Sequence, residues 1–177
     1  MRIFLATACV FSMIPWGITA AETPLNYDTS FDKALRYPGF AVNKGLSKKA
    51  VWKKVQDEKT GACLEVITPA DATAEIFGPK IPVQKEKDTL KFSVHVKGKG
   101  IFQIVFYEYR KDNRYLHYTP SKKYSKISVN SQEWIKKEFE IPLTGLKDQC
   151  AFIALAFHIK KDSNIRFDDF TGSIITN

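Results

Sequence analysis

The strongest constraint on this fold is a stretch in which apolar and polar side chains alternate strictly. The stretch Leu90–Lys97 reads LKFSVHVK. Successive side chains of a β-strand point to opposite faces, so this pattern predicts a strand with one face in a core and the other in water. Gly98, Lys99 and Gly100 follow and predict a turn. Ile101–Arg110 then returns as a second strand, so the two runs together predict a hairpin.

The same alternation predicts which side chains share a surface. Apolar residues of each strand face the core, the residues between them face outward, and a register error of one residue would invert the assignment. The predicted inward set is Leu90, Phe92, Val94, Val96, Phe102, Ile104, Phe106, Ile153, Leu155, Phe157 and Ile159. The predicted outward set is Lys91, Ser93, His95, Lys97, Gln103, Val105, Tyr107, Tyr109, Ala154, Ala156 and His158.

The rest of the chain is a succession of short β-like runs separated by turn residues. No segment repeats apolar residues at helical spacing over several turns. Short strands at this spacing, with no helix between them, predict an all-β fold, a two-sheet antiparallel β-sandwich. Further strands are expected at 48–55, 62–67, 74–83, 114–119, 124–129, 134–141, 150–160 and 164–175.

The N-terminal residues have the pattern of a secretory signal peptide. Met1 and Arg2 precede the mainly apolar run Ile3–Ile14, and the small residues of Thr19–Ala21 suit a cleavage site. The alternative, a membrane anchor, would need a longer apolar run. We therefore expect a secreted or periplasmic protein. The expected organisation is a leader at 1–21, a polar segment or edge strand at 22–36 and one β-sandwich domain at 37–177.

The chain carries a formal net charge of +8, and many of its lysines occur in pairs. Paired lysines on alternating strands are typical of solvated faces and protected edges. A basic groove for an acidic polymer is the alternative. The sequence contains no recognised nucleic-acid-binding motif, and no segment after the leader is apolar enough to span a membrane. We expect a monomer that neither binds nucleic acid nor inserts stably into a membrane.

Two cysteines follow the leader, Cys63 and Cys150, and each begins an apolar run. In an oxidising compartment they could form one disulfide. Two buried free thiols are the competing interpretation. Their wide separation, with no nearby pair of histidines, does not suit a zinc site.

Several landmarks recur along the chain in an order that resembles a known family. They are Tyr37–Phe40, Gly61–Val66, Leu90–Gly98, Ser131–Trp134, Phe139–Pro142 and Asn164–Phe170. Their order and spacing resemble the jelly-roll carbohydrate-binding modules appended to bacterial cellulases and xylanases, within the galactose-binding-like group. The resemblance spans residues 37–175 and implies a jelly roll.

The resemblance also implies a structural calcium ion. Members of the family hold it with a backbone carbonyl, which corresponds to Gly61, and with an aspartate that corresponds to Asp168 or Asp169. Ala41 stands where the family commonly has a glutamate ligand. Calcium takes six or more oxygen ligands, so this departure weakens the expected site. The alternative is an aspartate pair bonded to the backbone or to a lysine.

Sugar binding is the function that the resemblance implies, on aromatic side chains of one sheet face. Sugar rings stack their C–H faces on flat aromatic surfaces, and their hydroxyls need donors and acceptors. Trp52 and Trp134 match family positions that pack in the core, and the odd spacing of Tyr115 and Tyr118 allows only one of them on the predicted face. The predicted ligand-binding residues are Tyr107, Tyr109, His95, Gln103 and His158. Ordinary cross-strand pairing is the alternative for the tyrosines.

Two other classes of function remain open. The sequence lacks the common catalytic motifs, so we expect no enzyme. A polysaccharide-degrading enzyme would have to use a carboxylate pair such as Glu108 and Asp112, or a lyase set such as His117, Tyr107 and Arg110. The other alternative is an extracellular protein-binding or structural module.

Overall fold

The computed structural model describes residues 20–25, 41–42, 49–59 and 61–176, and within them the chain is almost entirely β-structure. The only helical turn among these residues is a short 3-10 turn, η1, at Leu143–Gly145. The strands are β1 Ala21–Pro24, β2 Ala41–Val42, β3 Val51–Asp57, β4 Gly61–Thr68, β5 Ala74–Pro82, β6 Asp88–Tyr109, β7 Tyr115–Pro120, β8 Ile127–Pro142, β9 Phe152–Ile159 and β10 Ser163–Thr176. The all-β prediction is confirmed.

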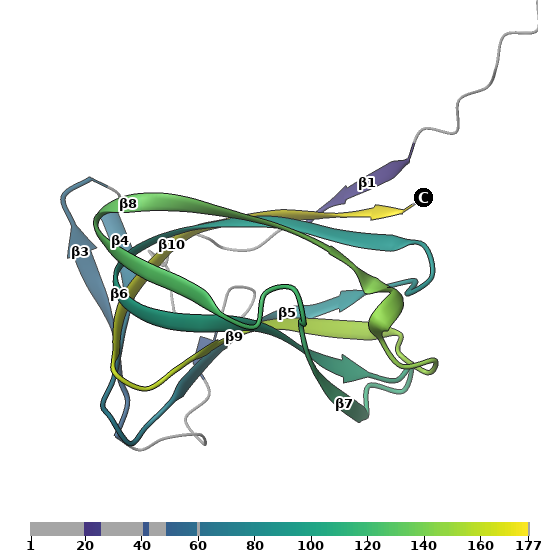
Figure 1. Cartoon of the computed structure of the whole chain (residues 1–177). Helices are drawn as coiled ribbons and strands as arrows, with labels where there is room; N and C mark the ends of the chain where they lie inside the picture. Colours follow the sequence, from purple (N-terminus) through teal and green to yellow (C-terminus); the bar gives the residue numbers. More distant parts are fainter. Residues whose placement is uncertain (1–19, 26–40, 43–48, 60, 177) are drawn as a thin grey trace, which may run out of the picture.

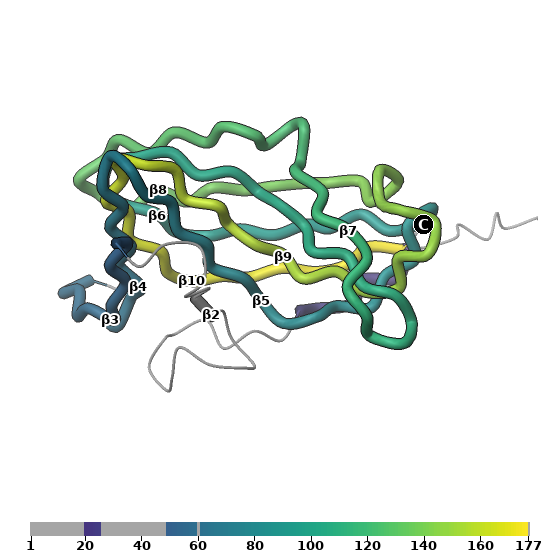
Figure 2. The backbone as a smooth tube through the Cα atoms, turned by 90° about the horizontal axis from the view of Figure 1, so that it is seen from below, coloured from purple at the N-terminus to yellow at the C-terminus, as the bar shows by residue number. Residues whose placement is uncertain are grey.

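The strands form two antiparallel layers that share the long strand β6 (Figure 1). In the first layer the order is β3, β4, β10, β6 and β8, and β1 extends the layer beside β10. In the second layer the order is β2, β5, β9, β6 and β7. Figure 2 looks onto this second layer. The arrangement is the predicted antiparallel β-sandwich.

Strand β6 passes from one layer to the other without reversing direction, so the hairpin prediction is wrong. Its first half pairs with β10 and its second half with β9, while β8 follows it through the corner. Gly98 and Gly100 lie at this corner with φ of 117° and 155°. A Cβ on Gly98 would lie 2.2 Å from the carbonyl oxygen of Asn164, so the glycines permit close strand contact and a bend rather than a turn.

The predicted core faces are nevertheless correct on both halves of β6. Because the strand does not reverse, the same alternation of faces continues through the corner. Phe102 is fully buried, and its ring centroid lies 5.5 Å from those of Phe157 and Phe167. Phe92 and Phe139 stack with their centroids 4.7 Å apart. These rings from β6, β8, β9 and β10 fill the space between the layers.

The N-terminal predictions lie mainly outside the described residues. Residues 1–19, which include most of the expected leader, and residues 26–36 are among those not described. The described start of the chain forms β1, in which Glu22 pairs with Ile175 and Pro24 with Ser173 of β10. Among the described residues, no helix is long and apolar enough to cross a membrane. Removal of the leader remains a prediction.

Cys63 and Cys150 are both buried free thiols. Cys63 lies on β4, where the charges of Asp168 and Arg166 act on its thiol. The Cys150 Sγ instead donates a hydrogen bond to the carbonyl of Phe152 at 3.3 Å. The two thiols have different surroundings, and the structure matches the interpretation as buried thiols rather than as a disulfide.

Candidate functional site: a tyrosine cluster on the second layer

Four tyrosines gather on the outer face of the second layer, where β6 and β7 pair. Tyr107 and Tyr109 come from β6, and Tyr115 and Tyr118 come from β7. The ring centroid of Tyr107 lies 5.4 Å from that of Tyr118 and 6.2 Å from that of Tyr115. The centroid of Tyr109 lies 6.2 Å from that of Tyr115. We call these four residues the tyrosine cluster.

A register shift between β6 and β7 makes this cluster possible. Tyr118 pairs with Tyr107, but the register shifts between Glu108 and Tyr109, so that Tyr115 pairs with Tyr109. A β-bulge of this kind changes which face a side chain points to. The prediction that only one of Tyr115 and Tyr118 could share the face is therefore wrong, because it assumed an unbroken alternation.

Polar partners, the buried Glu75 and the half-buried His158, contact two of the tyrosine hydroxyls. The Tyr107 hydroxyl donates to Glu75 Oε2 at 2.5 Å, and Glu75 is fully buried. Burial and this hydrogen bond raise the pKa of Tyr107. The Tyr118 hydroxyl lies 3.3 Å from Nδ1 of His158. Burial, followed by the nearby charge of Lys160, lowers the pKa of His158, so its imidazole is mainly neutral at pH 7.

Small residues and one lysine surround the rings. Ala154 pairs with Tyr107, and Ala156 pairs with Val105, so short side chains lie beside the cluster on β9. The Lys80 Nζ lies 3.8 Å from the centroid of the Tyr109 ring. The same ammonium donates to the carbonyl of Asn113 at 3.2 Å, which joins β5 to the turn between β6 and β7.

Four of the five predicted ligand-binding residues lie on this face. Tyr107, Tyr109 and His158 are half-buried, whereas Gln103 is only 9% exposed and the neighbouring Val105 is fully buried. The prediction that Gln103, Val105, Ala154 and Ala156 face water is wrong, because this part of the face is buried, and the predicted outward Ser93 of the first layer is buried as well. The accessible part is the end formed by the tyrosine cluster, where Tyr115 is 57% exposed.

His95, the fifth predicted residue, lies on the other layer. It pairs with Asp168 of β10 and Lys136 of β8, and its Nδ1 lies 3.3 Å from Asp169 Oδ2. Its predicted place beside Tyr107 is wrong for the same reason as the hairpin: β6 does not fold back at Gly98, so its two halves present outward side chains on different layers.

Two of the predicted calcium ligands, Asp168 and Asp169, lie at a bulge of β10 in the first layer. Asp168 is 1% exposed, and its Oδ1 accepts a hydrogen bond from the backbone N–H of Asp169 at 2.9 Å. The Asp169 carboxylate faces His95, and Gly61 begins β4 with φ of 82°. The described residues contain no cluster of three or more His, Cys, Asp or Glu side chains suited to a metal. By themselves they supply too few oxygens for calcium, which remains a prediction.

Trp134 lies outside the core, in an ionic network on the outer face of the first layer. Its Nε1 donates to Asp57 Oδ1 at 3.2 Å, and Lys97 Nζ donates to Asp57 Oδ2 at 2.9 Å. The Arg166 Nε donates to Glu65 at 2.9 Å. The hydrogen bond from Lys97 is the main cause that lowers the pKa of Asp57. The predicted core position is wrong for Trp134, whereas Trp52 does pack against the core.

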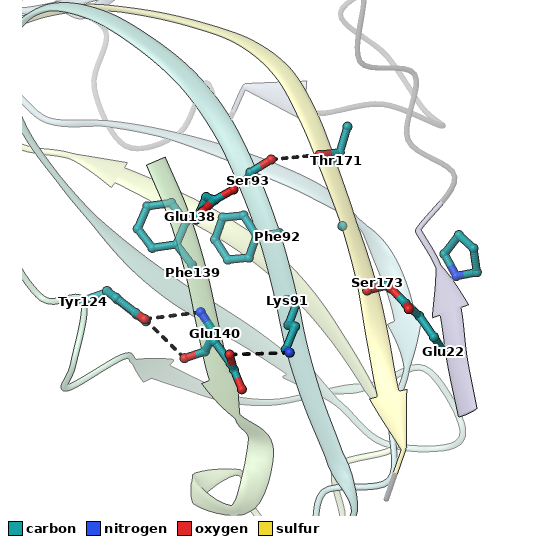
Figure 3. Close-up of a pocket in the computed structure, with 12 residues that line it drawn as sticks. Glu22, Lys91, Phe92, Ser93, Tyr124, Glu138, Phe139, Glu140, Thr171 and Ser173 are labelled. Atoms are coloured by element: carbon teal, nitrogen blue, oxygen red, sulfur yellow. Dashed lines mark hydrogen bonds and ion pairs between the residues drawn. The ribbon is translucent and has the colours of Figure 1, made fainter. Parts of the chain in front are cut away.

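A cavity of about 630 Å³ lies on the outer face of the first layer (Figure 3). Its polar side chains bind one another: Ser93 and Thr171 share a hydrogen bond of 2.8 Å, and Lys91 lies 3.6 Å from Glu140. Tyr124 reaches it with a hydroxyl that donates to the Glu140 carbonyl at 3.3 Å. It lacks a group of exposed rings, so the tyrosine cluster is the better candidate site.

The carboxylate pair proposed for glycoside hydrolysis is not assembled. Glu108 is fully buried, accepts hydrogen bonds from the Thr119 hydroxyl and, at 2.7 Å, from the backbone N–H of Lys147. Asp112 lies in the exposed turn and pairs with Arg114 Nε at 2.8 Å. Glu108 therefore points into the protein and supports its structure.

Comparison with solved structures identifies the class of fold. The CBM22-1 xylan-binding domain of Xyn10C from Paenibacillus barcinonensis matches with a TM-score of 0.58 and 12% identity, over 90% of this chain and 97% of that domain. The family 11 carbohydrate-binding module of Lic26A-Cel5E from Clostridium thermocellum matches with 0.55 and 16%, over 90% and 96% of the two chains. A complex of the family 11 module from Clostridium thermocellum with a β-1,3-1,4-mixed-linked tetrasaccharide matches with 0.53 and 16%, over 91% and 98%.

The chain therefore has the jelly-roll β-sandwich fold of the carbohydrate-binding modules, as the resemblance predicted. No protein-family model matches the sequence, and no curated protein sequence matches it.

Proposed function

We propose that this protein is an exported, non-catalytic carbohydrate-binding domain that holds a poly- or oligosaccharide on the tyrosine cluster. The observation that carries the proposal is the gathering of four tyrosine rings at the accessible end of one sheet face. Aromatic rings stack on the C–H faces of sugars. They contribute most to affinity where several rings can contact the same polysaccharide chain. The carbohydrate-binding modules that share the fold support the same class of ligand.

The polar groups around the rings support an oriented ligand. The Tyr118 hydroxyl and the His158 imidazole lie together on this face, and the ammonium of Lys80 lies over the ring of Tyr109. Hydroxyl, imidazole and ammonium groups can donate to or accept from sugar hydroxyls. A saccharide that stacks on Tyr115 would therefore lie near groups that can hydrogen-bond to its hydroxyls.

The charges near the cluster favour an acidic polysaccharide. Lys80 contacts the turn between β6 and β7, which carries Arg110, Lys111 and Arg114 against the single acid Asp112. This cationic rim would attract carboxylate or sulfate groups, and the attraction would weaken with salt. The proposal also includes export to the periplasm or exterior, a monomeric state and a structural calcium held by the Gly61 carbonyl and by Asp168 or Asp169.

The direct test is binding to insoluble and immobilised polysaccharides, in paired neutral and acidic forms such as arabinoxylan and glucuronoxylan. Tyr115→Ala removes the most exposed ring and should weaken binding about tenfold, the scale of one good stacking contact. Val51→Ala is a matched control, because Val51 is 51% exposed but lies on β3 in the first layer. The proposal fails if neither polysaccharide binds, or if both variants bind as tightly as the unmodified protein.

Calcium and export need their own measurements. Binding and melting temperature compared in calcium and in chelator test the ion. N-terminal sequencing of the protein recovered from culture medium or periplasm tests the leader, with Glu22 as the expected first residue. A protein recovered only in the cytoplasm with Met1 intact would contradict export.

A further inference from the structure

An apolar pocket of about 370 Å³ opens at one end of the sandwich, apart from the tyrosine cluster. Its floor is made by Phe106, Ile141, Leu143 and Leu146, which are all nearly fully buried. These residues come from β6, from the end of β8 and from the segment around η1. The pocket is therefore an extension of the core to the surface rather than a shallow groove.

The mouth of the pocket is polar and positively charged. Lys122 and Lys123, both exposed, line it from the loop between β7 and β8, together with the exposed Thr144. The Lys123 Nζ lies 5.1 Å from the centroid of the Tyr124 ring, outside the pocket floor. No acidic side chain lines the pocket among the described residues. Among the lining side chains, an anionic group at the mouth would therefore meet two lysines and no acid.

Hydrogen bonds hold both walls in place. Glu108 accepts from the Thr119 hydroxyl on one wall and from the backbone N–H of Lys147, next to the other wall, at 2.7 Å. The backbone N–H of Ser121 donates to the carbonyl of Ile104 at 2.9 Å. Walls fixed in this way form the pocket before a ligand arrives, which reduces the entropic cost of binding.

We propose that this pocket binds a small amphiphile that carries one acidic group. The apolar body lies on the floor formed by Phe106, Ile141 and Leu143, and the acid faces Lys122 and Lys123. Small-molecule sites are mostly apolar cavities with a few placed polar groups, and this volume is at the small end of their range. Burial of the apolar body supplies the affinity, and the lysines select the charged head group.

This site is distinct from the saccharide site. Phe106 and Thr119 line the pocket, whereas their chain neighbours Tyr107 and Tyr118 form part of the tyrosine cluster. Neighbouring residues of a strand point to opposite faces, so the two sites lie on opposite sides of the β6–β7 pair. A polysaccharide on the cluster leaves the pocket open.

The test is a titration of the purified protein with sodium octanoate, followed by calorimetry and by backbone amide chemical shifts. Octan-1-ol is the matched neutral probe, with the same apolar body. Octanoate should bind more tightly than octan-1-ol, and the shifts should centre on the segments 119–123 and 141–146. Equal binding of the two probes, shifts centred elsewhere, or no binding would overturn the proposal.

Two variants separate the floor from the mouth. Gly145 lines the pocket, and a Cβ on it would meet nothing within 4 Å, so Gly145→Phe adds a ring at the edge of the pocket at little cost to the fold and should weaken octanoate binding. The double change Lys122→Met and Lys123→Met should weaken octanoate about two- to fivefold and leave octan-1-ol unchanged. Lys126→Met, in the same loop but outside the pocket, is the control.

Unchanged octanoate binding by a folded Gly145→Phe protein would contradict the proposal. If that variant fails to fold, the chemical shifts of the unmodified protein decide the case.

Discussion

The Cα of Gly98 lies so close to Asn164 that a Cβ on it would come within 2.2 Å of the Asn164 carbonyl oxygen. This contact lies at the corner where β6 leaves the side of β10 and joins β9. It decides that His95 and Tyr107, on the same strand, belong to different layers. The bend at Gly98 therefore determines which side chains can form a binding face.

Gly98→Ala should destabilise the fold by about 2–4 kcal/mol, because the residue has a φ of 117° and its new methyl group would strike backbone atoms. Chemical denaturation measures the change. Gly145→Ala is the matched control and should stay within about 0.5 kcal/mol, since a Cβ there meets nothing within 4 Å. Equal stability of the two variants would mean that the corner is not constrained as described.

Tyr107→Phe should separate the structural role of the hydroxyl from the role of the ring. The change leaves Glu75 without its 2.5 Å hydrogen bond from Tyr107, and Glu75 is fully buried, so the free energy of unfolding should fall by about 1–3 kcal/mol. The ring remains, so saccharide binding should change little at temperatures where the protein is folded. Tyr115→Phe, at the most exposed ring, should not affect stability. A loss of binding without a loss of stability in Tyr107→Phe would show that the hydroxyl contacts the ligand.

Acid should destabilise the protein through Asp57. Hydrogen bonds from Lys97, the Lys59 backbone and Trp134 lower the pKa of Asp57 in the folded state. A lowered folded-state pKa contributes stability above the unfolded-state value, and this contribution is lost as the pH falls below about 4. Stability measured from about pH 6 to pH 2 should therefore fall less steeply in Asp57→Asn than in the unmodified protein.

Asp112→Asn is the control for this pH effect. Asp112 also has a lowered pKa, through the backbone and side chain of Arg114, but it is exposed in the turn between β6 and β7. Surface pairs contribute little to stability, so this variant should show the same pH profile as the unmodified protein. Parallel profiles for all three proteins would contradict the role assigned to Asp57.

The thiols of Cys63 and Cys150 should be unreactive in the folded protein. Burial raises the pKa of each thiol to about 11, and only the thiolate is a good nucleophile. A thiol reagent at pH 8 should label both residues only after denaturant is added, as mass spectrometry of the digested protein would show. Immediate labelling of either residue in the folded protein would disagree with its burial.

The sequence predicted the buried faces better than it predicted the candidate site. Leu90–Val96 alternates with a period of two, and Phe102, Ile104 and Phe106 continue the same inward face, so the local pattern predicted these core side chains. The tyrosine cluster needed more than alternation. Tyr115 and Tyr118 share a face only because the register of β7 against β6 shifts beside Tyr109. Nothing in the separate runs of sequence reports how two strands pair.

Sequence alone determined that the chain forms short β-strands, that these pack as a sandwich, and which side chains of 90–106 and 153–159 face the space between the layers, because strand periodicity is a local property. Only the tertiary structure decided whether Gly98 turns the chain back or carries it into the next layer. That choice depends on contacts with Asn164, whose backbone lies far away in sequence and approaches within a distance that only glycine allows.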